Sequence, residues 1–175
     1  MPQTDQKVEQ DAEFLFREPV ANDGPAITAL IAACPPLDAN SAYCNLLQCA
    51  HFAPYCLVAE REGQVLGWVS GYRPPSDPTA FFVWQVAVSE AARGQRLARR
   101  MILALLGRAA VRDATHLITT ITAGNRASWA LFESLARHWD LTLESGVCFE
   151  RNTHFAGAHP TEWQARLGPL PHRSA

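Results

Sequence analysis

Two neighbouring stretches decide how this 175-residue chain folds: Phe81-Phe82-Val83-Trp84-Gln85-Val86-Ala87-Val88 and Arg93-Gly94-Gln95-Arg96-Leu97-Ala98. The first is apolar on both faces of an extended strand except at Gln85, which is typical of a strand buried between two layers at the centre of a sheet. The second contains a glycine and leads into apolar positions at helical spacing, up to about Arg112. Together they predict a central strand, a short loop and a helix.

The remaining chain predicts further strands and helices around this unit. Alternating or β-branched stretches indicate strands at 14–17, 56–60, 65–72, 117–122, 141–149 and 163–167. Capping residues and helical spacing indicate helices at 26–33, 42–49 and 125–139. A strand–helix–strand crossover in the second half makes this an α/β protein with a mixed sheet. Adjacent side chains on a strand point to opposite faces, so Trp84 and Gln85 are expected on different faces.

The composition excludes several classes of protein. With 48% apolar and 18% charged residues, the chain is expected to form one domain over 13–170, with a disordered leader at 1–12 and a flexible tail at 171–175. A net charge of −2 gives no overall attraction to nucleic acid or anionic lipid. Its apolar runs are also far shorter than the roughly 18–20 residues of a membrane span. We therefore expect no nucleic-acid or membrane partner.

Five cysteines stand at scattered positions, without a Cys-x-x-Cys pair or the spacing of zinc ligands. Buried free thiols in a reducing cytoplasm explain this pattern. We therefore expect neither a disulfide framework nor a metal site.

The loop before the helix that begins near Leu97 is a candidate phosphate site. Amide N–H groups at a helix N-terminus have no partner within the helix, and the helix dipole adds partial positive charge. Four arginines lie on this turn, enough for a diphosphate and a further phosphate: Arg93, Arg96, Arg99 and Arg100. A solvated helix face explains the arginines equally well, and the glycine spacing fits neither a P-loop nor a dinucleotide fingerprint.

The Val86-x-Val88 strand, the Arg93-Gly94 loop and the following helix resemble the acetyl-CoA pyrophosphate motif of GNAT-type N-acetyltransferases. The stretch Asn125-x-x-Ser128-x-x-Leu131-Phe132 is similar to the last helix of that superfamily. Longer motifs resemble the L-2,4-diaminobutyrate acetyltransferases of ectoine synthesis: Cys34-Pro35-Pro36-Leu37-Asp38, Ser70-Gly71-Tyr72, Phe82–Val88 and Thr119-Thr120-Ile121.

The resemblance implies a GNAT-type fold, with a mostly antiparallel sheet splayed at its centre and four flanking helices. It implies a homodimer that transfers acetyl from acetyl-CoA to the 4-amino group of L-2,4-diaminobutyrate, with no metal. Two departures stand out. Ala91 and Arg96 fill the first and last positions of the pyrophosphate motif, and a non-glycine residue such as Arg96 does not easily hold a positive φ. Phe132 replaces the usual tyrosine, which leaves the general acid unassigned.

For the cofactor, the resemblance implies binding along the splayed strand, the loop and the last helix. Amide N–H groups at Val86 and Val88 would pair with the pantetheine arm, and the one at Val86 would polarise the acetyl carbonyl. The loop amides of Arg93, Gly94, Gln95, Arg96, Leu97 and Ala98 would hold the diphosphate. Asn125 would hold the pantetheine arm or the thiol region.

For the acceptor, a carboxylate is needed to hold the 2-ammonium group, and Asp38 is the first candidate because nearby residues already offer helix caps. Tyr43 is expected on the inward face, either in the site or in the core. Trp84 would form a wall of the pocket. Gln85, the polar residue in mid-strand, needs a partner that is either the substrate or the protein itself.

Two further candidates come from later in the chain. Either Thr119 or Thr120 could present a hydroxyl to the site, although strand packing explains them nearly as well. The resemblance places a histidine of the last loop near the substrate, which makes His159 the candidate base or proton relay. The carboxylate that usually precedes this histidine is either missing or supplied by Glu162, and a surface histidine is the alternative.

Two rival functions remain open on the sequence. The acceptor could be another small amine or a lysine side chain. The chain could also be an acyl-CoA sensor without turnover, an alternative favoured by Ala91, Arg96 and Phe132.

Overall fold

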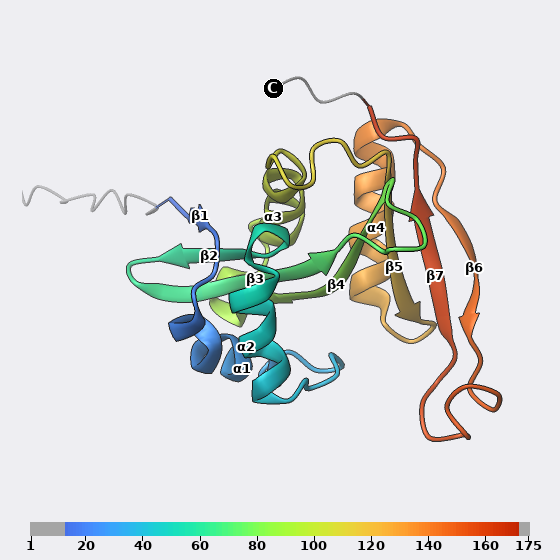
Figure 1. Ribbon diagram of the computed structural model, residues 1–175, viewed down its shortest axis with the longest axis horizontal. Coiled ribbons are helices and arrows are strands. Elements are labelled where there is room, and N and C mark those ends of the chain that lie inside the picture. Colours follow the sequence, from blue (N-terminus) through green and yellow to red (C-terminus); the bar gives the residue numbers. More distant parts are fainter. Residues whose placement is uncertain (1–12, 172–175) are drawn as a thin grey trace, which may run out of the picture.

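The computed structural model describes residues 13–171, so the expected leader at 1–12 and residues 172–175 of the expected tail lie outside the described residues. Seven strands form one sheet in the order β1-β2-β3-β4-β5-β7-β6 (Figure 1). They are β1 Leu15–Arg17, β2 Leu57–Arg61, β3 Gln64–Tyr72, β4 Ala80–Val88, β5 His116–Thr122, β6 Glu144–Phe149 and β7 Glu162–Leu167. The pairing of β4 with β5 is parallel and the other five pairings are antiparallel, which confirms the expected mixed sheet.

Helices cover both faces of the sheet, as expected. They are α1 Gly24–Ala32, α2 Ala42–His51, α3 Leu97–Leu106 and α4 Arg126–Trp139. Leu97, Met101 and Leu135 of α3 and α4 pack with the sheet in one apolar core. Ile27, Ile31 and Cys49 of α1 and α2 form a second core on the other side. None of the helices in residues 13–171 is long and apolar enough to cross a bilayer.

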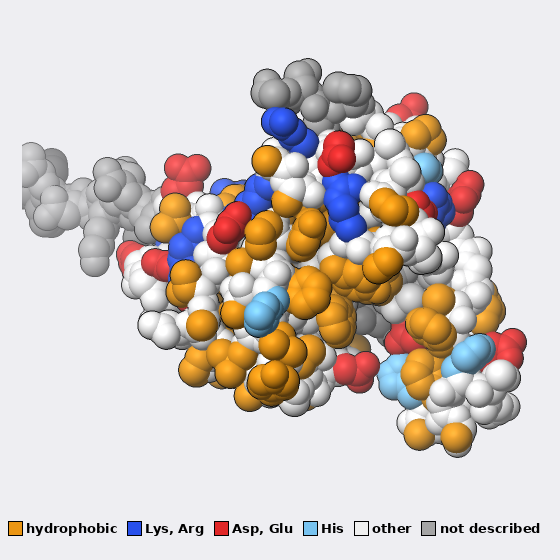
Figure 2. All heavy atoms as spheres, in the orientation of Figure 1, with side chains coloured by type: hydrophobic (Ala, Val, Ile, Leu, Met, Phe, Trp, Pro, Cys, Tyr) orange, Lys and Arg blue, Asp and Glu red, His pale blue; other side chains and the backbone are white. Residues whose placement is uncertain are grey.

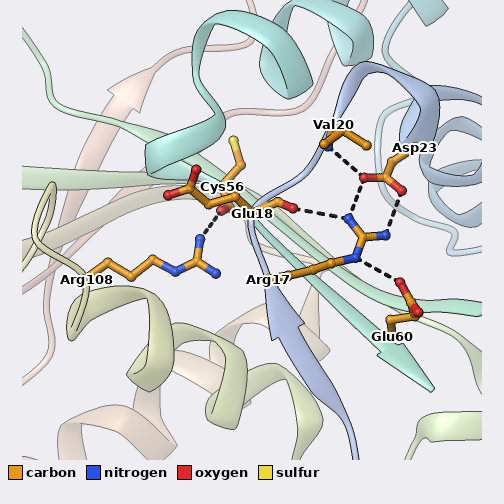
Figure 3. Close-up of polar contacts among 7 residues, drawn as sticks. All are labelled: Arg17, Glu18, Val20, Asp23, Cys56, Glu60 and Arg108. Carbon is orange, nitrogen blue, oxygen red and sulfur yellow. Dashed lines mark hydrogen bonds and ion pairs between the residues drawn. The ribbon is translucent and has the colours of Figure 1, made fainter. Parts of the chain in front are cut away.

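The helix that follows the central strand is shorter than the sequence predicts. It ends at Leu106 rather than near Arg112, and short i→i+3 bonds follow, from Arg108 N–H to Leu105 O and from Val111 N–H to Arg108 O. Gly107 is a poor helix former, and the Arg108 guanidinium turns back to donate to Cys56 O at 2.7 Å (Figure 3). This turn buries Val111 against the sheet.

An arginine network ties the first edge of the sheet to the helices on one face (Figure 3). Arg17 on β1 donates to both carboxylate oxygens of Asp23, at 2.7 and 2.8 Å, and its Nε donates to Glu60 at 2.8 Å. The two bonds from Arg17 to Asp23 lower the pKa of the Asp23 carboxyl, because they favour its charged form. Since Asp23 lies just before α1, the network sets where the α1–α2 pair begins.

The sheet opens between β4 and β5, as the family resemblance implies. In the described chain these strands pair only over Ala80–Phe82 and His116–Ile118, and Figure 1 shows them diverging beyond that point. Thr119 Oγ1 donates to Val83 O at 2.8 Å where the gap begins. Backbone groups of β4 beyond Val83 therefore face an opening instead of a neighbouring strand.

A β-bulge at Trp84 corrects the expectation that Trp84 and Gln85 lie on opposite faces. Ser70 of β3 is paired with Gln85 and Gly71 with Val83, so Trp84 is an extra residue without a partner. The extra residue resets the alternation of side chains. Trp84 lies beside the Tyr72 ring, 6.1 Å between centroids, and shares one cavity with Gln85.

Candidate active site

Three adjoining cavities run through the opening of the sheet. A cavity of about 560 Å³ lies beside the loop before α3, a channel of about 370 Å³ follows, and an inner pocket of about 200 Å³ lies beyond it. The first two share Val88, Arg93 and Ala98, and the last two share Val86 and Asn125. We call them the phosphate cavity, the channel and the acceptor pocket.

The phosphate cavity is built by a strained loop at the start of α3. Gly94 has φ +78°, and Arg96, the N-cap of α3, adopts φ +55° and ψ +25°. The expectation that Arg96 resists a positive φ is therefore wrong, although the left-handed region costs a non-glycine residue about 1–2 kcal/mol. This conformation presents the first amides of α3 to a cavity that Arg93, Arg96 and Arg99 also line.

Three of the four arginines on this turn line the phosphate cavity, and the fourth packs on aromatic rings. Arg100 does not join the cavity: its guanidinium lies over the rings of Phe14 and Phe16, 5.5 and 5.6 Å from their centroids. The expectation of four cations at one site is corrected to three on this turn. Gln95 does not line the cavity either, and its side chain bonds back to Ala91 O at 3.5 Å. Any binding role of Gln95 would fall to its backbone.

The channel is bounded by apolar side chains and by free edges of the backbone. Ser89 N–H donates to Leu66 O at 2.8 Å, which sets the hydrogen-bond alternation between β3 and β4. By that alternation the N–H groups of Val86 and Val88 point away from β3, toward the opening. Asn125 caps α4 with its Oδ1, which accepts from Ser128 N–H at 3.1 Å. Its amide nitrogen has no partner within the described chain and lies where the channel meets the pocket.

The acceptor pocket brings together side chains from distant parts of the chain. Asp38, from the loop between α1 and α2, lies with its Oδ2 3.3 Å from His159 Nε2. Glu162, the first residue of β7, lies with its Oε1 3.8 Å from the same nitrogen. Trp84, Gln85 and Thr120 line the pocket beside them. Figure 2 shows the loop before β7 as a lobe at lower right, divided from the body by a hollow with an acidic side chain on one bank and a histidine on the other.

The contacts of His159 favour its charged form. Its Nδ1 lies 2.8 Å from Pro160 O, an acceptor only, so Nδ1 carries a proton and Nε2 faces the two carboxylates. The bond to Pro160, followed by the charges of Asp38 and Glu162, raises the pKa of His159 above its usual value. One imidazole nitrogen and two carboxylates lie within 4.8 Å of one another, a donor set that could also hold a divalent cation.

Glu162 carries a polar atom that the protein leaves without a partner. Its Oε2 is buried without a hydrogen-bond partner in the described structure, and burial raises the pKa of this carboxyl, against a smaller lowering by His159 and the Thr120 hydroxyl. A buried carboxylate oxygen without a donor is costly, so a bound cation that donates to it is favoured. The sequence presents Glu162 only as a possible partner of His159. Its place at the start of a strand facing Thr122 was not recognisable without the strand register.

The model of the Acetyltransferase (GNAT) family matches residues 25–136 of this chain. The chain belongs to the GNAT family. It is 49% identical over 153 residues to an L-2,4-diaminobutyric acid acetyltransferase of Methylotuvimicrobium alcaliphilum, covering 87% of this chain and 89% of that relative. It is 46% identical to a protein of that name from Vibrio cholerae, covering 88% and 89%. These relatives place the chain in the diaminobutyrate acetyltransferase branch of the GNAT family.

A solved structure agrees with this placement. Diaminobutyrate acetyltransferase EctA from Paenibacillus lautus, in complex with its substrate L-2,4-diaminobutyric acid and coenzyme A, matches the chain with a TM-score of 0.86. The two are 32% identical, and the match covers 94% of this chain and 99% of that one. The GNAT-type fold expected from the sequence motifs is thereby confirmed.

Within this GNAT fold, some of the predicted acceptor residues gather in the pocket and one does not. Asp38, Trp84, Thr120 and His159 line it. Tyr43 does not: it is 70% exposed, which corrects its expected inward position. The inward face of α2 carries Asn45, Gln48 and Cys49, and Tyr43 points about 200° away from Asn45 around the helix.

The predicted partner of Gln85 is the protein. Its Nε2 donates to Asp38 O at 2.6 Å and its Oε1 accepts from Asn40 at 2.8 Å, so both ends of the amide hold the loop that carries Asp38. This favours the structural alternative, and direct substrate contact by Gln85 stays a prediction. Thr119 is likewise held by Val83 O, which leaves Thr120 as the threonine of the pocket.

Proposed function

We propose that this chain is an acetyl-CoA-dependent N-acetyltransferase that acetylates the 4-amino group of L-2,4-diaminobutyrate, giving N4-acetyl-L-2,4-diaminobutyrate for ectoine synthesis. One observation supports it above the others: the cavities change from cationic to apolar to acidic along one continuous path. Coenzyme A has the same order, with phosphates, a pantetheine arm and a thiol. The acidic pocket lies where the thioester would end.

The acidic pocket fits an acceptor with more than one amino group. Asp38 and Glu162 contribute two carboxylates, and Glu162 Oε2 still lacks a donor within the described chain. We assign the 2-ammonium group to these carboxylates, with Asp38 at the mouth and Glu162 at the buried end. His159 holds the two carboxylates at a fixed separation and, in its neutral form, could take a proton from the attacking amine.

The attacking amine must be neutral. An amine with a pKa near 10.4 costs roughly 4–5 kcal/mol to deprotonate at pH 7, at about 1.36 kcal/mol per pKa unit. The neighbouring 2-ammonium and partial desolvation both lower that pKa. Direct attack on the thioester carbon then forms the C–N bond, while the N–H of Val86 would stabilise the developing oxyanion.

The proton balance does not require a tyrosine. The nitrogen loses one proton as it becomes an amide, and the departing thiolate gains one. One proton transfer through water, from the nitrogen to the thiolate, completes the reaction. The buried Phe132 side chain, 2% exposed, keeps bulk solvent away from that end of the pocket. The absence of a hydroxyl at Phe132 is therefore compatible with turnover.

Thiol release tests this function directly. Acetyl-CoA is mixed with L-2,4-diaminobutyrate, ornithine or a lysine peptide, and free thiol is followed with a chromogenic disulfide. We expect release with diaminobutyrate at a far higher kcat/KM than with the other amines, and NMR of the product should show acetylation at N4. Tight cofactor binding without release would support the sensor alternative, and preference for another amine would support a different acceptor.

The expected cytoplasmic location and homodimer are also part of this proposal. The free thiols support a reducing compartment, since the five cysteines form no disulfide in the described chain. For the dimer, β6 offers a surface: it is an edge strand exposed along most of its length, with Val147 50% and Phe149 44% exposed. Unpaired strand edges with apolar side chains readily pair with another strand.

A further inference from the structure

The phosphate cavity contains more positive charge than the loop before α3 needs for a diphosphate. Besides Arg93, Arg96 and Arg99, it is lined by Arg137 and His138 from the last turn of α4. No carboxylate is among its lining residues in the described chain, and none forms an ion pair with these arginines there. By contrast, Arg17 and Arg166 are paired with carboxylates.

The extra charge lies on a different element from the loop, at the end of α4. Arg93 and Ala98 line both the phosphate cavity and the channel, so the loop begins beside the channel, while Gly94, Arg96 and Arg99 line the phosphate cavity alone. Arg137 and His138 line the phosphate cavity and not the channel. A helix C-terminus carries partial negative charge, so an anion at the end of α4 must be held by side chains.

A contact between helices holds one of these side chains in place. Arg99 Nη2 lies 2.8 Å from His138 Nδ1. A guanidinium can only donate, so Nδ1 is the acceptor and His138 is neutral in this arrangement. The pair links α3 to α4 and keeps a full positive charge on Arg99 at the cavity wall.

We propose that Arg99 and Arg137 bind the 3′-phosphate of coenzyme A, with His138 as the residue that positions Arg99. The inference rests on the proposed function, because it takes coenzyme A as the ligand. Along that molecule the diphosphate follows the pantetheine arm and the 3′-phosphate on the ribose comes last. The loop, which begins beside the channel at Arg93, therefore receives the diphosphate on its amides, and the side-chain cations on α3 and α4 receive the terminal phosphomonoester.

Calorimetry with coenzyme A and dephospho-coenzyme A, which lacks only the 3′-phosphate, tests the proposal. Wild-type protein should bind coenzyme A about tenfold or more tightly than the dephospho form. Arg99→Met and Arg137→Met should each weaken coenzyme A about tenfold and change the dephospho form by less than twofold. Arg100→Met is the matched control. It removes the same charge from the residue next to Arg99, but the Arg100 guanidinium stacks on the Phe14 ring and does not line the cavity.

His138 is tested by rescue. His138→Ala should reduce the preference for coenzyme A, and His138→Asn should restore much of it, because the amide oxygen can accept from Arg99 as Nδ1 does. Equal weakening of both ligands in Arg99→Met and Arg137→Met would assign these residues to the diphosphate and overturn the proposal. Equal wild-type affinities, or unchanged affinities in both variants, would also overturn it. If wild-type protein binds neither ligand, the proposed function itself fails.

Discussion

Asp38 and His159 meet across the mouth of the acceptor pocket, with Oδ2 3.3 Å from Nε2. Asp38 comes from the α1–α2 loop on one face of the sheet, and His159 comes from the loop before β7. Their contact joins the two halves that the opening of the sheet separates. In the function we propose, Asp38 would therefore act on the substrate directly and, through His159, on the shape of the pocket.

Asp38→Asn should raise the KM for diaminobutyrate about tenfold, because it removes the charge that holds the 2-ammonium at the mouth. The KM for acetyl-CoA should stay the same, since Asp38 does not line the channel. Steady-state kinetics with each substrate varied in turn measures both values. Unchanged kinetics for diaminobutyrate would remove Asp38 from the ammonium site.

Glu162→Gln should lower kcat/KM for diaminobutyrate by about 10–100-fold, because it neutralises the buried carboxylate. The same change should not destabilise the empty protein. Burial raises the pKa of Glu162, so wild-type stability falls as pH rises from the ordinary carboxyl value through the raised one. Above that range we expect the variant to melt at a higher temperature than wild type.

Melting curves from pH 4 to 8, without substrate, check this second part. The advantage of Glu162→Gln should be small at pH 4, where both proteins carry a neutral group at this position. A variant that is less stable than wild type at every pH would show that Glu162 supports the fold instead of the site.

Asp38→Asn should also lower the pKa of His159, since the Asp38 charge is one of the causes of its raised value. NMR titration of the imidazole measures this shift. A raised folded pKa stabilises the protein fully below the ordinary histidine value, and that contribution is lost as pH rises through the folded value. The stability difference between Asp38→Asn and wild type should therefore be largest below about pH 6.5 and shrink above the folded pKa.

Arg96→Gly should stabilise the fold and lower the affinity of the protein for coenzyme A. Glycine accepts φ +55° without the cost that arginine bears, about 1 kcal/mol. The melting temperature should rise, and affinity for coenzyme A should fall because one cation leaves the phosphate cavity. Arg96→Ala is the control: it removes the same charge but keeps the strain, so it should lose affinity without gaining stability.

Val147→Glu should convert the proposed dimer to a monomer, because charges on an edge strand prevent pairing with a second copy. Leu15→Glu offers a matched control, since Leu15 is 57% exposed on β1, the opposite edge of the same sheet. Light scattering after size-exclusion chromatography gives the mass. A monomeric wild type, or a dimer that survives Val147→Glu, would rule out β6 as the interface.

Much of the fold could be predicted because it depends on local patterns. The two-sided apolar stretch that ends at Val88 identified the central strand, and the N-caps Ser41 and Asn125 marked the starts of two helices. The end of α3 was predicted wrongly because the bond that turns the chain, from Arg108 to Cys56 O, joins residues far apart in sequence. A helical pattern that continues past Gly107 does not contain that information.

The sequence by itself determined the sheet, the glycine-containing loop at the start of α3 and the residue types that line the pocket. Only the tertiary structure decided which of those residues meet. The bulge at Trp84 changes which face the side chains of β4 point to. Arg100 packs on the rings of Phe14 and Phe16 and does not line the phosphate cavity, and Glu162 lies in the pocket beside His159. The physical reason is that charge pairing and burial depend on distances in space, which residue spacing along a chain does not set.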